Sequence, residues 1–261
     1  MTSLLEISDL HISFVSRHAE VAAVRGVDLR VEEGRTVALV GESGSGKSST
    51  SKGVAKALGL QYLDTGAMYR ALTWWMLTNG VDVDDTAAVS SVVARPTLVM
   101  GTDPEAPAVA VDERDVSAEI RGPEVTANVS AVSAVPEARE LLVRMQRAII
   151  EEATRNGAGI VVEGRDITTV VAPDAPVKLF LTASAEARAQ RRSKEFRTGD
   201  VAATQADLAR RDELDSNRTV SPLTQTEDAT ELDTTGLSLD EVIALIVELV
   251  DKARGPVAAA E

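Results

Sequence analysis

Cysteine is absent from the 261-residue sequence, and histidine occurs only as His11 and His18, close to the start. Without cysteine the chain forms no disulfide, thiolate nucleophile, thiolate zinc site or iron–sulfur cluster. A Ser-His-Asp triad is excluded everywhere except near those two histidines. Chemistry elsewhere must use Lys, Arg, Asp, Glu, hydroxyls and backbone groups, a set that suits phosphoryl transfer.

Positive charge is also scarce, because 27 Lys and Arg face 41 Asp and Glu, giving a formal net charge of −14. This balance argues against duplex nucleic acid or an acidic membrane surface as a partner, since both require a positive footprint. No apolar run approaches the roughly 18 residues of a membrane span. The start, MTSLLEISDL, lacks the cationic and apolar regions of a signal peptide. We therefore expect a cytoplasmic protein with no membrane partner.

Hydrophobic patterning predicts an α/β fold with a mostly parallel sheet covered by helices on both faces. Residues 5–33 alternate in the manner of antiparallel strands. A continuous apolar strand over 36–40 enters a glycine-rich loop, and a helix is expected over 47–58. The remaining predicted strands are 60–63, 160–163, 177–181 and 230–232, and the remaining predicted helices include 137–155 and one that begins at Ser238.

Two segments fall outside this alternation of strands and helices. Residues 95–122 contain Pro96, Gly101, Pro104 and Pro107 between short Val-rich runs, which predicts small hairpins inserted into the α/β core. Residues 255–261 are expected to form a disordered tail.

Residues 41–48, GESGSGKS, fit the phosphate-loop pattern G-x-x-x-x-G-K-[ST] and lie between a predicted strand and a predicted helix. The loop N–H groups and the helix N-terminus favour phosphate there, and Lys47 would reach the outer phosphates. The predicted ATP-binding residues of the loop are Gly41, Ser43, Gly44, Ser45, Gly46, Lys47, Ser48 and Ser49. Ser48 and Ser49 are the candidate Mg²⁺ ligands.

One predicted helix gathers Arg188, Arg191 and Arg192 on a single face, at positions i, i+3 and i+4. Guanidinium groups this close repel one another slightly, and a bound triphosphate would reverse that repulsion. A solvated basic face relieved by nearby glutamates is the alternative interpretation.

A second helical face presents Arg211, Asp215 and Arg218 at positions i, i+4 and i+7. These side chains form either a local ion pair or a ligand-binding face. Arg165 and Asp166 follow the predicted strand over 160–163 and should therefore emerge at the carboxyl edge of the sheet, where open α/β folds bind ligands.

Residues 1–48 resemble the beginning of an ATP-binding cassette ATPase of the peptide-transporter type, through LLEISDLHISFV and VRGVDLRVEEGRTVALVGESGSGKS. The later cassette signature LSGGQ is absent from the sequence. The resemblance therefore ends within the phosphate loop, and residues 1–35 are expected to form an appended β segment.

From about residue 47 onward the chain resembles the bacterial cytidylate (CMP) kinases. The segments that carry this resemblance are YLDTGAMYR (62–70), VSAVSAVP (129–136), VEGRDITT (162–169), PDAPVKLFLTA (173–183), RRDELDSNR (210–218) and SP (221–222). The resemblance implies a P-loop nucleoside monophosphate kinase that converts ATP and CMP, or dCMP, into ADP and CDP, or dCDP, with Mg²⁺. It further implies a kinase domain over 36–254 with a CMP-binding region over about 95–135 and a helical lid over about 184–200, acting as a monomer in pyrimidine metabolism.

Site roles follow from the same resemblance, position by position. The implied substrate-binding residues are Thr65, Tyr69, Arg70, Ser130, Arg139, Arg165, Asp166, Arg211, Asp215 and Arg218. The implied catalytic residues are Lys47, Arg165, Asp166, Arg188 and Arg211, while Arg188, Arg191 and Arg192 belong to the lid that closes over ATP. Ser130 and Arg139 match the pair that reads cytosine, although the position of Arg139 near a helix start would by itself indicate a surface residue.

The sequence departs from the kinase pattern on either side of the first loop glycine. The family usually has aspartate before this glycine and proline after it, where this chain has Val40 and Glu42. One alternative is therefore a folded nucleotide binder whose hybrid loop is inactive. A second, less favoured alternative is the ATPase subunit of a peptide transporter.

Overall fold

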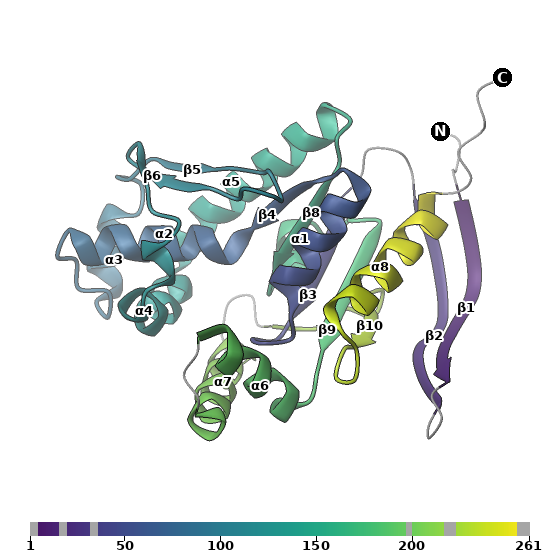
Figure 1. Ribbon diagram of the computed structural model, residues 1–261. Helices are drawn as coiled ribbons and strands as arrows, with labels where there is room; N and C mark the ends of the chain where they lie inside the picture. The colour runs from purple at the N-terminus through teal and green to yellow at the C-terminus, as the bar shows by residue number, and fades with distance from the viewer. Residues whose placement is uncertain (1–4, 16–19, 32–35, 197–199, 217–222, 255–261) are drawn as a thin grey trace.

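The computed structural model describes residues 5–15, 20–31, 36–196, 200–216 and 223–254 (Figure 1). Side chains are described for residues 36–194, 200–210, 212–213 and 223–250. The tail predicted over 255–261 lies outside the described residues. In the part of the chain that is described, no helix combines the length and apolarity needed to cross a membrane.

A five-stranded parallel sheet forms the centre of the molecule, in the order β10-β9-β3-β8-β4. Its strands are β3 (Thr36–Gly41), β4 (Gln61–Asp64), β8 (Ile160–Gly164), β9 (Val177–Thr182) and β10 (Thr230–Asp233). The predicted parallel sheet is confirmed, and each of these strands lies within one residue of its predicted bounds. Strand β3 lies in the middle, between two strands that come more than a hundred positions later in the chain.

Strand β3 contributes side chains to the hydrophobic layers on both faces of the sheet, because successive side chains of a strand point to opposite faces. Val37 and Leu39 belong to the layer formed with helices α1 (Lys47–Leu58) and α8 (Leu239–Arg254). Ala38 and Val40 belong to the opposite layer, formed with α2 (Thr65–Thr78) and α5 (Pro136–Arg155). All four of these β3 side chains are buried, so the strand that carries the phosphate loop is held from both sides.

Local sequence fixes where the flanking helices begin and end. Helix α1 starts after Gly46, whose φ of 88° is left-handed, and ends at Gly59, whose φ of 64° is also left-handed. At the start of α8, Glu241 N–H donates to Ser238 Oγ (3.3 Å) and Ser238 N–H donates to Glu241 Oε2 (2.8 Å). This reciprocal pair is the capping box that the sequence predicts.

The segment predicted to hold small hairpins forms a separate three-stranded antiparallel sheet, which confirms the prediction. Its strands are β5 (Leu98–Met100), β6 (Val109–Val111) and β7 (Arg114–Asp115). Helix α3 (Thr86–Val92) precedes this sheet, and the 3₁₀ turn Glu119–Arg121 and helix α4 (Pro123–Ala134) follow it. Helix α4 is not predicted by the patterning, since its sequence is rich in β-branched residues and serine, which have modest helix propensity.

Helices α6 (Ala185–Phe196) and α7 (Val201–Ser216) pack against each other beside the phosphate loop (Figure 1). Helix α6 covers most of the segment predicted as a lid, over about 184–200, and α7 begins just after that segment; residues 197–199 lie outside the described part. At the N-terminus, β1 (Leu5–Val15) and β2 (Glu20–Val31) form the predicted antiparallel pair. Figure 1 shows this hairpin beside α8, and both strands contact that helix.

Candidate functional site

A cavity of about 580 Å³ opens where β3, β4 and β8 end, at the carboxyl edge of the parallel sheet. Open α/β sheets bind ligands at this edge, and the volume suits a small-molecule site. Many of the predicted site residues line it, namely Ser43, Gly44, Ser45, Gly46, Lys47, Ser48, Ser49, Thr65, Tyr69, Arg70, Ser130, Arg139, Arg165, Asp166, Arg191 and Arg192. The cavity therefore joins the phosphate loop to the segments expected at the CMP end.

Five predicted residues are not among those that line the cavity: two are described elsewhere in the fold, and three lie outside the described residues or side chains. Gly41 and Arg188 do not line the cavity. A Cβ on Gly41 would lie 2.3 Å from the backbone oxygen of Leu181, so close packing of β3 on β9 explains that glycine. Arg218 lies outside the described residues, and so do the side chains of Arg211 and Asp215 on α7.

The phosphate loop bends through two left-handed glycines before α1 begins. Gly44 and Gly46 have φ values of 80° and 88°, a conformation that glycine adopts without strain. The loop lies at the N-terminus of α1, where backbone N–H groups and the helix dipole favour an anion. Lys47, the first residue of the helix, lines the cavity at the same place. The local geometry suits a phosphate group.

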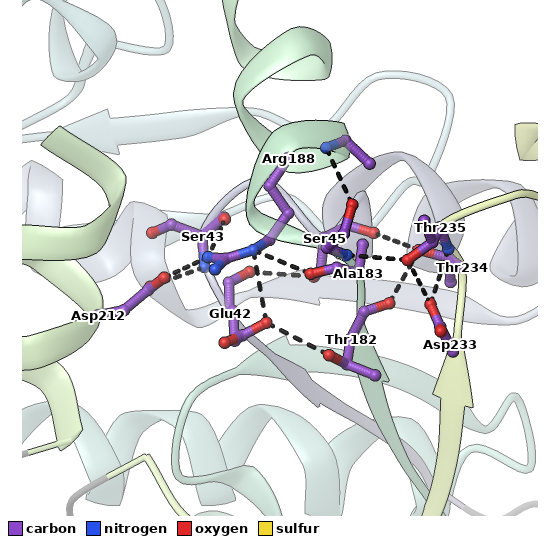
Figure 2. Close-up of polar contacts among 12 residues, drawn as sticks. Glu42, Ser43, Ser45, Thr182, Ala183, Arg188, Asp212, Asp233, Thr234 and Thr235 are labelled. Carbon is purple, nitrogen blue, oxygen red and sulfur yellow. Dashed lines mark hydrogen bonds and ion pairs between the residues drawn. The ribbon is translucent and has the colours of Figure 1, made fainter. Parts of the chain in front are cut away.

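Arg188 packs behind this loop. Its side chain donates from Nε to the backbone oxygen of Ala183 and from Nη1 to that of Ser43, both at 3.2 Å (Figure 2). It also forms an ion pair with Asp212 and a longer one with Glu42, at 3.5 Å from Nε to Oε2. With 8% of the residue exposed, Arg188 fixes α6 against the back of the loop.

The other two arginines of α6 line the cavity. Arg191 donates from Nη1 to the backbone oxygen of Ser45 (3.3 Å) and to Thr234 Oγ1 (2.9 Å). Burial lowers the pKa of Arg191, and nearby Asp233 opposes that shift. The basic face predicted on this helix is thus divided between a buried anchor, Arg188, and two cavity-lining residues.

Arg165 reaches the loop from the end of β8. Its Nη2 donates to Ser43 Oγ at 2.6 Å, and its Nη1 lies 3.8 Å from Asp212 Oδ1. Ser43 N–H donates to the same Asp212 oxygen at 3.2 Å. Sequence reasoning gave Asp212 no role, although it lies directly after Arg211 in a segment that carries the kinase resemblance.

At the far end of the cavity, Arg139 and Asp166 form a buried ion pair, with side-chain exposures of 6% and 9%. Arg139 also donates from Nη1 to the backbone oxygen of Ser133 (3.2 Å) and lies over the Tyr69 ring, 5.7 Å from its centroid. The Arg139 guanidinium is therefore a buried cation that is held in place beside an aromatic ring. Position alone would indicate a surface residue, and that interpretation is wrong.

Two further predicted residues, Arg70 and Thr65, hold the cavity wall between these ends. Arg70 donates from Nη1 to Thr126 Oγ1 (2.8 Å) and to the backbone oxygen of Ile120 (3.2 Å). Thr65 donates from Oγ1 to the backbone oxygen of Glu163 (2.8 Å). These bonds attach the start of α2 to β8 and to the inserted region.

Glu163, the one acidic residue of strand β8, is a cavity-lining group that sequence reasoning did not assign. Its Oε2 accepts from Ser48 Oγ at 2.9 Å, and its Oε1 accepts from the Tyr62 hydroxyl. Burial raises the pKa of Glu163 to about 7, Asp64 adds to the rise, and Lys47 opposes it. An acidic residue that ends an otherwise apolar strand, IVVE, is the signal that could have found it.

The oxygen atoms around Ser48 are of the kind that Mg²⁺ binds. Mg²⁺ keeps several waters and uses one or two protein ligands together with substrate phosphates, so it does not need an all-protein cage. Among the residues described, no group of three His, Cys, Asp or Glu side chains forms such a cage. The Ser48 hydroxyl and the adjacent Glu163 carboxylate supply the oxygen donors that Mg²⁺ prefers, and Ser49, which is exposed, also lines the cavity.

Neither of the two departures from the kinase pattern lines the cavity. Val40 is fully buried in the core of the sheet. Glu42 Oε2 accepts from Thr182 Oγ1 at 3.4 Å and faces Arg188 (Figure 2). Glu42 is absent from the cavity lining. The charge of Glu42 is thus directed behind the loop, toward a cation.

The family model and two similar curated relatives carry the same description. The family described as cytidylate kinase matches residues 37–252. The cytidylate kinase of Streptomyces griseus subsp. griseus is 57% identical over 218 residues, covering 84% of this chain and 93% of that protein. That of Rhodococcus jostii is 52% identical over 223 residues, covering 84% and 96%. A solved structure of shikimate kinase from Acinetobacter baumannii aligns with 83% of this chain and 92% of its own, at 14% identity and a TM-score of 0.40.

Proposed function

The chain belongs to the cytidylate kinase family, and we propose that it transfers the γ-phosphoryl group of ATP to CMP, giving ADP and CDP. The observation that carries this proposal is the single cavity whose lining runs from the phosphate loop to the Arg139–Asp166 pair. In the proposed arrangement, two nucleotides lie end to end in this cavity, with their phosphates meeting near Arg165. Family membership supplies the identity of the two substrates.

At the donor end, the loop N–H groups, Lys47, Arg191 and Arg192 bind the ATP phosphates. Phosphoryl transfer passes through a loose transition state in which charge spreads over the transferred oxygens, so catalysis depends on positioning and charge neutralisation. Arg165, held on Ser43 Oγ, supplies positive charge at the meeting point. Arg188 and Arg211 are assigned to catalysis as well. Arg188 contributes by positioning the phosphate loop, through its hydrogen bond to the backbone oxygen of Ser43.

At the acceptor end, Thr65, Tyr69 and Arg70 bind the CMP phosphate, and Ser130 with Arg139 reads the base. Cytosine presents N3 and O2 as acceptors, which a hydroxyl and a guanidinium complement. Asp166 fixes that guanidinium, so a wrong base leaves buried polar groups unpaired, and sites of this kind discriminate strongly. Asp215 and Arg218 complete the proposed CMP site, and dCMP is included as an acceptor.

Magnesium is proposed to be held at Ser48 and Ser49 together with the ATP phosphates, with Glu163 beside them. When bound, it neutralises phosphate charge and so favours transfer. Ser48 Oγ is already oriented by its hydrogen bond to Glu163, which supports this assignment.

The same proposal extends to the organisation of the chain. Residues 36–254 form the kinase domain, with a CMP-binding region over about 95–135 and a lid over about 184–200. Residues 1–35 are an appended segment resembling the start of a cassette ATPase, and the family match that begins at residue 37 supports that boundary. We further propose that the protein acts as a monomer in the cytoplasm, on its small-molecule nucleotide substrates.

A coupled assay of ADP release tests the function, with CMP, dCMP, UMP, AMP and GMP as acceptors. We expect fast turnover with CMP and dCMP, slower turnover with UMP, and loss of activity when EDTA removes the metal. Equal turnover with all five acceptors would overturn the proposal. ATP hydrolysis that does not depend on an acceptor would overturn it as well.

A further inference from the structure

One carboxylate on α7, that of Asp212, contacts cationic and N–H groups from three separate parts of the chain. It forms an ion pair with Arg188 from α6, lies 3.8 Å from Arg165 Nη1 after β8, and accepts from the N–H of Ser43 in the phosphate loop at 3.2 Å. Figure 2 shows it pointing toward Ser43 and Arg188. Nothing in the proposed binding of ATP or CMP uses this carboxylate.

Asp212 lies behind the wall of the cavity. Two of its partners, Ser43 and Arg165, line the cavity, whereas Asp212 and Arg188 do not. The Asp212 side chain is 14% exposed. A nucleotide in the cavity would therefore contact the groups that Asp212 holds, and Asp212 itself would act on the reaction only through them.

Electrostatics explains why those groups need a carboxylate at this point. The Arg165 and Arg188 side chains are 17% and 10% exposed, so both positive charges are largely withdrawn from water and lie next to the same loop. A buried charge needs a partner of opposite sign, and two like charges this close disfavour each other. Asp212 offsets both charges and leaves Arg165 free to keep its short bond to Ser43 Oγ.

Glu42 also faces Arg188 but does not duplicate this role. Its carboxylate pairs with Arg188 at 3.5 Å and accepts a hydrogen bond from Thr182 on β9, and neither contact reaches Arg165 or the N–H of Ser43. Among the described residues, Asp212 is the carboxylate that joins Arg165, Arg188 and the loop N–H.

We propose that Asp212 is a positioning residue for phosphoryl transfer, which ties α7 to the phosphate loop and aims Arg165 at the transferring phosphate. The inference rests on the proposed function, because Arg165 is assigned there to the meeting point of the two substrates. A misplacement of about 1 Å at such a point lowers rates by roughly a hundredfold. The loss should therefore fall on kcat more than on either KM.

The first test compares Asp212→Asn with Asp207→Asn. Asp207 lies on the same helix, and its pair with Arg210 is exposed, with side-chain exposures of 68% and 71%. We expect Asp212→Asn to lower kcat by roughly ten- to a hundredfold while the KM for ATP changes little. Asp207→Asn should leave kcat within about twofold of the wild type, and Asp212→Glu, which keeps the charge, should recover part of the loss.

The second test is a double-mutant cycle with Arg165→Ala. It separates a positioning role from a purely structural one, because a structural defect would lower kcat whether or not Arg165 is present. If Asp212 acts through Arg165, adding Asp212→Asn to Arg165→Ala should lower kcat by less than about twofold further. An equal loss of kcat in both backgrounds would overturn the inference. So would an unchanged kcat in folded Asp212→Asn. Thermal unfolding of each variant identifies the folded fraction, and Asp212→Glu replaces Asp212→Asn in the cycle if the asparagine variant does not fold.

Affinity for ATP, measured by calorimetry on the same four proteins, separates this inference from the proposed function. A wild-type protein that binds ATP but does not phosphorylate CMP would sink the proposed function. The inference, which rests on that function, would fall with it, whereas a wild type that phosphorylates CMP but shows equal losses of kcat in both backgrounds would overturn the inference alone.

Discussion

The carboxylate of Asp166 pairs with the guanidinium of Arg139 inside the fold, between the end of β8 and the start of α5. The pair joins a group expected at the reacting end of the acceptor site to one expected to read the base. A second bond, from Arg139 Nη1 to the backbone oxygen of Ser133, leaves the guanidinium little freedom. In the proposed site, recognition of the base would thus rely on an arginine that Asp166 and the Ser133 backbone oxygen hold in place.

Asp166→Asn should therefore both destabilise the fold and impair CMP binding. Removing one partner of a buried ion pair typically costs about 3–5 kcal/mol, because the other charge stays buried without compensation. Urea denaturation should show a loss of this size, and steady-state kinetics should show a raised KM for CMP with the KM for ATP almost unchanged. Glu140→Gln is the control, since its pair with Arg144 is 70% and 65% exposed and should be worth under about 1 kcal/mol. Equal effects of the two substitutions would contradict the prediction.

Glu163 should make the ligand-free protein less stable as the pH rises. Its pKa in the fold is raised to about 7, above the ordinary value of 4.5, so the folded state holds a proton that the unfolded state releases between these values. The contribution of Glu163 to the free energy of unfolding is fully present below pH 4.5 and is lost as the pH rises through about 7. The total loss is roughly 3 kcal/mol at most. Denaturation of wild type and Glu163→Gln in EDTA at pH 5 and pH 8 measures this, and the glutamine variant should gain relative stability at pH 8. A difference that is the same at both pH values would refute it.

The charge of Glu42 should matter little for ATP. Its carboxylate faces Arg188 and Thr182 behind the loop, outside the cavity. Glu42→Gln should leave the affinity for ATP within about fivefold, the range that a weak ion pair of about 1 kcal/mol permits. Isothermal titration calorimetry with ATP gives the comparison, and Lys47→Ala, which removes a cavity-lining cation, should lower the affinity far more. A strong gain in affinity on removing Glu42 would show that its charge does reach the phosphates.

The capping box at the start of α8 should contribute to stability independently of catalysis. Ser238→Ala removes the hydroxyl that accepts from Glu241 N–H, and loss of such a cap typically costs about 1 kcal/mol. Thermal unfolding should report that loss while kcat is retained. Ser91→Ala, an exposed serine within α3, should stay within about 0.5 kcal/mol of the wild type.

Much of the fold was predictable because its signals are local. The strands that became β3, β8 and β9 are short apolar runs, and the phosphate loop is a contiguous motif between a strand and a helix. The order β10-β9-β3-β8-β4 was not predictable in this way, because it depends on which distant segments pack together. Helix α4 was not predicted for a different reason, since its Val, Thr and Ser residues favour no single secondary structure strongly.

The candidate site divides along the same line. Loop residues such as Lys47 follow from the motif alone, whereas the placement of Arg139 depends on Asp166, which comes 27 positions later and supplies the opposite charge. Asp212 was missed because a single acidic residue in a helix has no local signature. Glu163 does have a local signal, as the acidic residue after the apolar run IVV, but that signal does not show which groups it contacts. Their importance depends on the cations and hydroxyls that the fold brings to them.

The hydrogen bonds around the phosphate loop also bear on when the site is completed as the chain is made. Ser43 accepts from Arg165, 122 positions later, and Ser45 accepts through its backbone oxygen from Thr234, 189 positions later. A ribosome-bound chain that ends before these residues carries the loop motif without the groups that support it. Because contacts of such long sequence separation form late and slowly, partly synthesised chains should not bind nucleotide as the finished protein does.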